Sequence, residues 1–107
     1  MSNGIIGGNT LAIGLLTVNL NPASVAANTT AEQTFTVNGL QLGDFVRVTK
    51  PTLNAGLGIV NVRVSAANTL AITFANNTAS PIDAAAENYL LFYVRPENNN
   101  NNVVTTA

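Results

Sequence analysis

Hydrophobic and polar residues alternate with a period of two along most of this 107-residue chain. Successive side chains of a β-strand point to opposite faces of its sheet, so this alternation predicts half-buried strands. The many β-branched side chains in these segments favour the same structure. The segments with clean alternation are Leu16–Leu20, Gln33–Val37, Val46–Thr49, Val60–Val64 and Leu70–Phe74.

A sixth segment, Tyr89–Val94, differs because both of its faces are apolar. This pattern predicts a central strand, or a strand that is covered on its second side. Six strands separated by turn residues predict an all-β fold. We expect an antiparallel β-sandwich, of the jelly-roll type.

Turn residues separate the predicted strands. Asn21-Pro22 ends the first strand, because proline cannot donate a hydrogen bond to a neighbouring strand. Asn38-Gly39 is a two-residue hairpin signal, since both residues adopt positive φ angles readily. The connection 76–87 is longer, polar and rich in alanine, and its segment Asp83–Glu87 is compatible with one helical turn.

The two ends of the chain differ in composition from the middle. Residues 1–14 are rich in glycine and asparagine and predict an N-terminal arm, and residues 98–107 begin with five asparagines and predict a C-terminal arm. The sandwich domain is expected to span residues 15–97. We expect neighbouring chains to order both arms, by addition of a strand to an exposed sheet edge. The apolar side chains expected to make these contacts are Ile5, Ile6, Leu11, Ile13, Val103 and Val104.

Charged residues make up 8% of the chain, with a net charge of -1, whereas about 25% is usual in soluble domains. Interspersed charge keeps domains apart in solution, so its scarcity predicts a surface that lies against other proteins. The basic residues are scattered along the chain, and we therefore expect no nucleic-acid binding. No uninterrupted apolar run approaches the roughly 20 residues that span a bilayer, so we expect no membrane insertion.

The chain has no histidine and no cysteine. Disulfides, thiolate metal sites and the usual base of a serine nucleophile are therefore excluded. Asp83 and Glu87 stand four residues apart, as paired carboxylates on a helix do, but we interpret them as part of a solvated loop. We expect no cofactor, no bound metal and no enzymatic activity.

Two sets of residues have alternative interpretations. Arg47 and Arg63 both lie on the polar side of a predicted strand, either as ordinary exposed residues or as directional contacts to carboxylates of a partner. Tyr89, Phe92 and Tyr93 either pack in the core and in an interface, or form a platform on which a sugar stacks.

Six segments of the strand and turn pattern form a familiar set: NPASVAANTTAEQTFTV (21–37), GLQLGDFV (39–46), KPT (50–52), GLGIV (56–60), VSAANTL (64–70) and YLLFYVRP (89–96). These segments resemble small virion proteins of tailed bacteriophages. In these segments the chain is similar to the β-sandwich or jelly-roll cement proteins, also called head decoration proteins, that clamp neighbouring capsid subunits. The shared features are strand and turn patterns without a catalytic signature, and both arms fall outside them.

The resemblance implies a structural protein on the capsid surface of the virion, made in the host cytoplasm. Its implied partners are the major capsid protein and further copies of itself, as a homodimer or homotrimer. The alternative function is a tail-fibre or head-fibre domain that binds a host surface glycan. In that case Tyr89, Tyr93 and the asparagine-rich loops are expected to line the sugar site.

Overall fold

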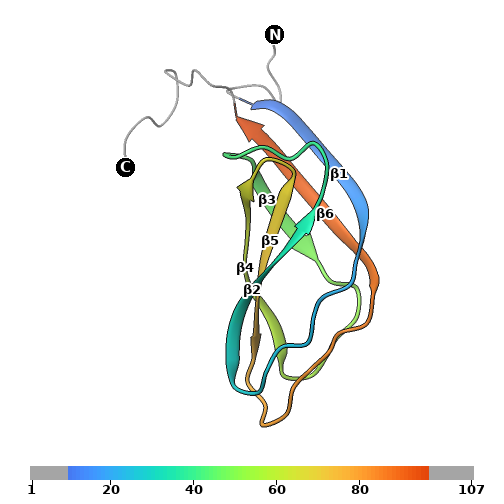
Figure 1. The fold of residues 1–107 in the computed structure, drawn as a ribbon. Helices are drawn as coiled ribbons and strands as arrows, with labels where there is room; N and C mark the ends of the chain where they lie inside the picture. The colour runs from blue at the N-terminus through green and yellow to red at the C-terminus, as the bar shows by residue number, and fades with distance from the viewer. Residues whose placement is uncertain (1–9, 97–107) are drawn as a thin grey trace.

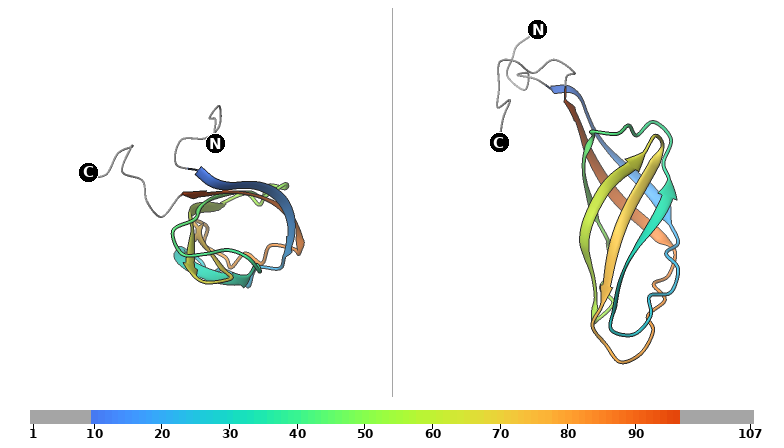
Figure 2. Two further views of the ribbon diagram at one scale, coloured as in Figure 1. Left: turned by 90° about the horizontal axis from the view of Figure 1, so that it is seen from above. Right: turned by 60° about the vertical axis from the view of Figure 1, so that its left-hand side comes forward.

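Residues 10–96 are described in a computed structural model, and they form six strands in two three-stranded antiparallel sheets (Figures 1 and 2). One sheet has the order β1-β6-β3 and the other the order β2-β5-β4. The strands are β1 (Thr10–Leu20), β2 (Thr29–Thr36), β3 (Phe45–Thr49), β4 (Leu57–Ala66), β5 (Thr69–Asn76) and β6 (Glu87–Pro96). The sheets pack face to face around one apolar core, so the predicted antiparallel β-sandwich is confirmed.

The strands pair from the two ends of the chain inward. The first strand pairs with the last (β1 with β6), and the second pairs with the fifth (β2 with β5). The two middle strands, β3 and β4, belong to different sheets but contact each other. This is the winding of a jelly roll, with six strands in the described residues instead of the usual eight. Because β6 lies between β1 and β3, the central strand predicted at Tyr89–Val94 is confirmed.

The first strand begins earlier than the sequence predicts. The composition of residues 1–14 predicts an arm, yet Thr10–Gly14 pair with the end of β6 as part of β1. Gly14 lies opposite Tyr93, and a Cβ atom at this position would overlap the Tyr93 ring. Gly14 therefore makes room for an aromatic ring, although the glycine-rich composition of residues 1–14 resembles that of a flexible arm. Ile5, Ile6, Val103 and Val104 lie outside the described residues.

Two local predictions are wrong. Asn38-Gly39 forms a turn, with φ of +103° at Gly39, but it does not join a hairpin, because β2 and β3 belong to different sheets. The chain crosses between the sheets here because Asn68, in the β4–β5 turn, binds backbone groups of residues 37–40. Asp83–Glu87 forms no helical turn, since Ile82 just before it bridges to Val25 and Glu87 begins β6.

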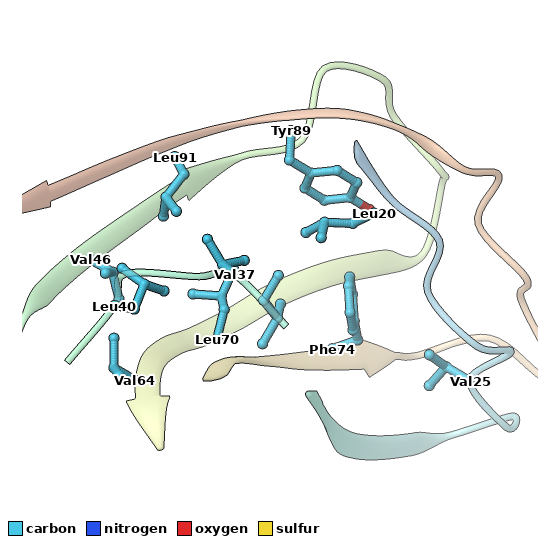
Figure 3. Packing of buried hydrophobic residues seen from close by; sticks show 11 residues of the cluster. Leu20, Val25, Val37, Leu40, Val46, Val64, Leu70, Phe74, Tyr89 and Leu91 are labelled. Carbon is cyan, nitrogen blue, oxygen red and sulfur yellow. The ribbon is translucent and has the colours of Figure 1, made fainter. Parts of the chain in front are cut away.

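The two central strands supply the largest buried side chains. The fully buried set is Tyr89, Phe74, Leu70, Ile72 and Leu91. Figure 3 shows the Tyr89 ring reaching from β6 into the core beside Leu20. The Tyr89 side chain is 0% exposed, and its hydroxyl has no hydrogen-bond partner within residues 10–96. Burial, with a smaller effect of the Glu87 charge, raises the pKa of Tyr89 to about 12.

The buried side-chain amide of Asn76 closes the end of the sandwich opposite the start of β1. The Asn76 side-chain nitrogen donates to the carbonyl oxygens of Val25 (3.0 Å) and Ser80 (2.9 Å). Its oxygen accepts a hydrogen bond from the Thr78 backbone N–H (2.9 Å). One side chain thus joins the β1–β2 connection to the β5–β6 connection, which keeps both connections against the core.

An ion pair at each end fastens the five-residue strand β3 to β6. Asp44 precedes β3 and accepts two hydrogen bonds from the Arg95 guanidinium (2.9 and 2.8 Å). Lys50 follows β3 and contacts Glu87 at 2.8 Å. A one-residue slip of β3 would break both pairs and turn its apolar side chains to the wrong face.

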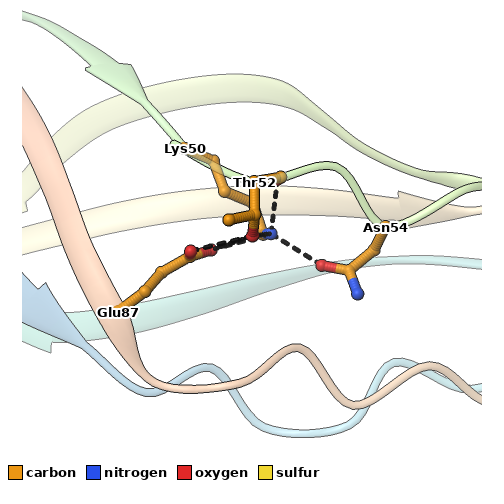
Figure 4. A network of polar contacts seen from close by, with 4 residues as sticks. All are labelled: Lys50, Thr52, Asn54 and Glu87. Atoms are coloured by element: carbon orange, nitrogen blue, oxygen red, sulfur yellow. Dashed lines mark hydrogen bonds and ion pairs between the residues drawn. The ribbon is translucent and has the colours of Figure 1, made fainter.

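The lysine end of β3 is part of a larger polar network, which Figure 4 shows. The Lys50 ammonium donates to the Asn54 side chain (2.6 Å) and to the Thr52 carbonyl oxygen (2.8 Å). The Thr52 hydroxyl donates to the Glu87 carboxylate (2.8 Å). The hydrogen bonds from Lys50 and Thr52 lower the pKa of Glu87, and the network holds the β3–β4 connection against the start of β6.

Tyr89→Phe is expected to stabilise the protein. The substitution keeps the ring and removes a buried hydroxyl that lacks a partner, a defect that costs about 1–3 kcal/mol. We expect the free energy of unfolding in urea to rise by about 1 kcal/mol. Tyr93→Phe is the matched control, because Tyr93 is partly exposed, and it is expected to have little effect. A clear loss of stability in Tyr89→Phe would show that the Tyr89 hydroxyl makes a stabilising hydrogen bond after all.

Asp44→Asn is expected to flatten the dependence of stability on acid pH. The hydrogen bonds from Arg95 hold the pKa of Asp44 below its ordinary value of 3.8. The folded state therefore favours the carboxylate, whose stabilising effect is present above pH 3.8 and is lost as pH falls through the lower, folded-state pKa. The variant is less stable at neutral pH but loses less stability on acidification.

Urea unfolding at a series of pH values below about 5 measures this effect. Asp83→Asn serves as the control, because it removes a carboxylate that makes no ion pair among the described residues. If the free energy of unfolding of both variants depends equally weakly on pH, the Asp44–Arg95 pair does not cause the effect.

Candidate functional site

The outer face of the β1-β6-β3 sheet is apolar. Tyr89 and Leu91 point into the core, so the alternate residues of β6 point outward. The strand register aligns them with outward residues of β1 and β3 in adjacent rows. The rows are Ile13–Val94–Phe45, Leu15–Phe92–Arg47 and Thr17–Leu90–Thr49. We call the six apolar members of these rows, Ile13, Leu15, Phe45, Leu90, Phe92 and Val94, the apolar face.

Most of the apolar face is open to solvent. Leu15 is 64% exposed and Phe45 is 61% exposed, and Ile13 and Leu90 are also exposed. A contiguous exposed patch of large apolar side chains on a small protein marks an interaction site, whereas single exposed leucines are ordinary. The all-apolar composition of β6 therefore reflects two different surfaces, the core on one side and an uncovered face on the other.

The outer face of the other sheet has the opposite character. Its cross-strand rows are made mostly of threonine, alanine and short polar side chains. They include Thr30, Thr34 and Thr36 of β2 and Thr69, Ala71 and Thr73 of β5. Such a face presents few large apolar side chains and gives little hydrophobic driving force for docking. The sandwich is thus two-sided, with one apolar face and one polar face.

The structure distinguishes the two arginines that sequence alone leaves equivalent. Arg63 lies on the polar face and donates two hydrogen bonds to the Glu32 carboxylate (2.7 and 2.8 Å), which lower the pKa of Glu32. Arg47 stands in the middle row of the other sheet, beside Phe92. It is exposed and has no ion pair or side-chain hydrogen bond within residues 10–96. Of the two arginines, Arg47 is therefore the one whose guanidinium is not already bound to a carboxylate among the described residues.

A groove of about 410 Å³ borders the apolar face along β3. It is lined by residues 45–48 of β3 and 59–62 of β4, the edge strands of the two sheets. Register shifts around Val60 and Ser65 interrupt β4, and such bulges discourage pairing with another strand. Arg47 lines this groove and also belongs to the outer face, so it stands where the two surfaces meet.

The predicted site residues are only partly brought together. Ile13 and Arg47 lie on the outer face of the β1-β6-β3 sheet, and Leu11 lies at the bulge near the start of β1. Leu11 lines a depression of about 270 Å³ with Leu42, next to the Asp44–Arg95 pair. Arg63 lies on the opposite face. Sequence reasoning did not select Leu15, Phe45 and Leu90 as site residues, although the apolar composition of both sides of β6 was a signal for Leu90.

The three aromatic residues of β6 do not form one platform. Tyr89 is fully buried, and Tyr93 lies on the same inward side of the strand and packs against the core. Phe92 points to the other side of the sheet, with the apolar face. Tyr89 therefore has no surface on which a sugar can stack, and the core interpretation of Tyr89 and Tyr93 is the one that fits.

The carboxylates of residues 10–96 are mostly paired with cations of the same molecule. Three of the four carboxylates in this range are held in ion pairs, and no three metal-ligating side chains cluster there. The same residues include no helix long and apolar enough to cross a membrane. Comparison with protein-family models, with curated proteins and with solved structures gave no match.

Leu15→Ser is expected to change the surface without changing the fold. Leu15 is largely exposed, so the free energy of unfolding should stay within about 0.5 kcal/mol of the wild type. Fluorescence of a dye that binds exposed apolar surface should fall, because the substitution removes one of the most exposed members of the apolar face. Leu53→Ser is the control, since Leu53 is 86% exposed but lies outside this face. An equal loss of dye binding in both variants would argue against a continuous patch.

Proposed function

We propose that this chain is a structural protein that binds the outer surface of a tailed-phage capsid and cements neighbouring major capsid subunits. The observation that carries the proposal is the exposed apolar face of the β1-β6-β3 sheet, in a chain with only 8% charged residues. Apolar contact is not weakened by the screening of charges, and it gives a chain with few charges a means of attachment. The resemblance of its strand and turn segments to cement proteins supports the same function.

The proposed partners are the major capsid protein and further copies of the chain, as a homodimer or homotrimer, on the virion surface. Identical sites recur many times on a capsid, so several modest contacts made together give strong attachment. A chain with few charges and no histidine or cysteine suits such a mechanical role better than a catalytic one. The glycan-binding alternative has less support, because Tyr89, one of its expected sugar contacts, is in the core.

The proposal predicts a high copy number and a mechanical effect. Quantitative mass spectrometry of purified particles should find the chain in numbers comparable to those of the major capsid protein. Particles assembled without it should release their genome at a lower temperature, and added protein should restore the wild-type temperature. A copy number typical of a single vertex or of the tail, or absence from the head, would contradict the proposal.

A further inference from the structure

Arg47 is the one cation in residues 10–96 that has no acidic partner there. The other three cations, Lys50, Arg63 and Arg95, each pair with a carboxylate of the same molecule. Arg47 instead stands among apolar side chains, in the row that contains Leu15 and Phe92. A partner that covers this face removes water from the guanidinium, which is costly unless the partner supplies a counter-charge.

The described residues of a second copy do not supply that counter-charge. Within residues 10–96 the outward positions of this face carry no acid: Glu32, Asp44 and Glu87 are held in ion pairs elsewhere, and Asp83 lies in the β5–β6 connection. If two copies packed these faces about a two-fold axis that runs along β6 at Phe92, Arg47 of one copy would face Leu15 of the other, because the two flank Phe92 in one row. If the axis ran along the row instead, the two Arg47 side chains would face each other. Neither arrangement gives the buried guanidinium groups a carboxylate.

The size of the face also argues against a stable dimer through it. Three strands at about 4.8 Å spacing and five residues at about 3.3 Å rise give a flat area of roughly 240 Å². Stable interfaces bury about 800 Å² on each partner. One such contact is therefore weak alone, and it suits attachment to a repeating surface where several contacts form together.

We infer that the apolar face docks on an apolar surface of a different protein, and that this surface presents a carboxylate to Arg47. This inference rests on the proposed function, under which the docking partner is the major capsid protein. The planar guanidinium binds a carboxylate through two parallel hydrogen bonds, so Arg47 fixes the orientation of a contact that apolar packing alone leaves free to slide. Contacts between copies of the chain then use other surfaces.

Two matched leucine variants test whether the docking partner presents a carboxylate to Arg47. Arg47→Leu and Arg63→Leu each remove an exposed guanidinium from an edge strand, on opposite faces of the sandwich. Cosedimentation with phage shells assembled without the chain measures binding. Arg47→Leu should bind at least about 30-fold more weakly, since it leaves a covered carboxylate without a partner, whereas Arg63→Leu should stay within about threefold of the wild type.

Two further outcomes of this comparison decide the inference. Arg47→Lys should bind better than Arg47→Leu, because a point charge replaces part of the interaction. Free Arg47→Leu should self-associate more than the wild type, because the charge that opposes symmetric pairing is gone. If Arg47→Leu binds shells as tightly as the wild type does, apolar contact is sufficient, and the inference that the partner presents a carboxylate to Arg47 is wrong.

Single cysteines identify the docked face independently, because the natural chain has no cysteine. Leu15→Cys places a thiol on the apolar face, and Thr34→Cys places one on the polar face. On shells, Leu15→Cys should be protected from a maleimide reagent while Thr34→Cys reacts. In the free protein both should react at every concentration, and protection of Leu15→Cys on concentration would instead identify a second copy as the occupant.

These measurements separate the two proposals. If the wild type binds shells but Thr34→Cys is the protected thiol, the cementing function stands and the inference about the apolar face is wrong. If the wild type does not bind shells at all, both fail together.

Discussion

The position of β6 between β1 and β3 is the constraint on which the rest of the structure depends. This strand buries Tyr89 and Leu91 in the core and turns Leu90 and Phe92 outward, so it builds both the centre of the sandwich and the centre of the apolar face. Its two ends carry Glu87 and Arg95, whose partners lie immediately before and after β3. Without β6, neither neighbouring strand of this sheet has a partner.

The use of charge in the molecule follows from this arrangement. Three ion pairs occupy six of the nine charged side chains, and two of these pairs fix the register of β3. An ion pair at the surface contributes little stability, but a pair at each end of a short strand selects one register among several. The scarcity of charge is thus compatible with a well-specified fold, and it leaves Arg47 as a charge that the described part of the fold does not use.

The alternation of residues was sufficient to predict six strands, their sandwich and the central place of β6, because both sheets bury one face against the same core. It did not place Gly14 in a strand, because the space that this glycine leaves for Tyr93 depends on a residue far along the chain. Arg47 and Arg63 are equivalent in their local sequence and differ only because Glu32 comes to lie near Arg63. The apolar face was likewise hidden, since alternation within one strand does not reveal which rows adjoin.

The pairing of the first strand with the last affects the order in which the chain can fold. During synthesis β1, β2 and β3 emerge before β6 and β5 exist, so neither sheet can form until most of the described chain has been made. Apart from the β4–β5 hairpin, the strand pairings join segments that are distant along the chain, and such topologies fold slowly. For that interval the side chains that later form both the core and the apolar face are exposed together. The risk of aggregation is therefore greatest during synthesis, before the last strand has covered the core.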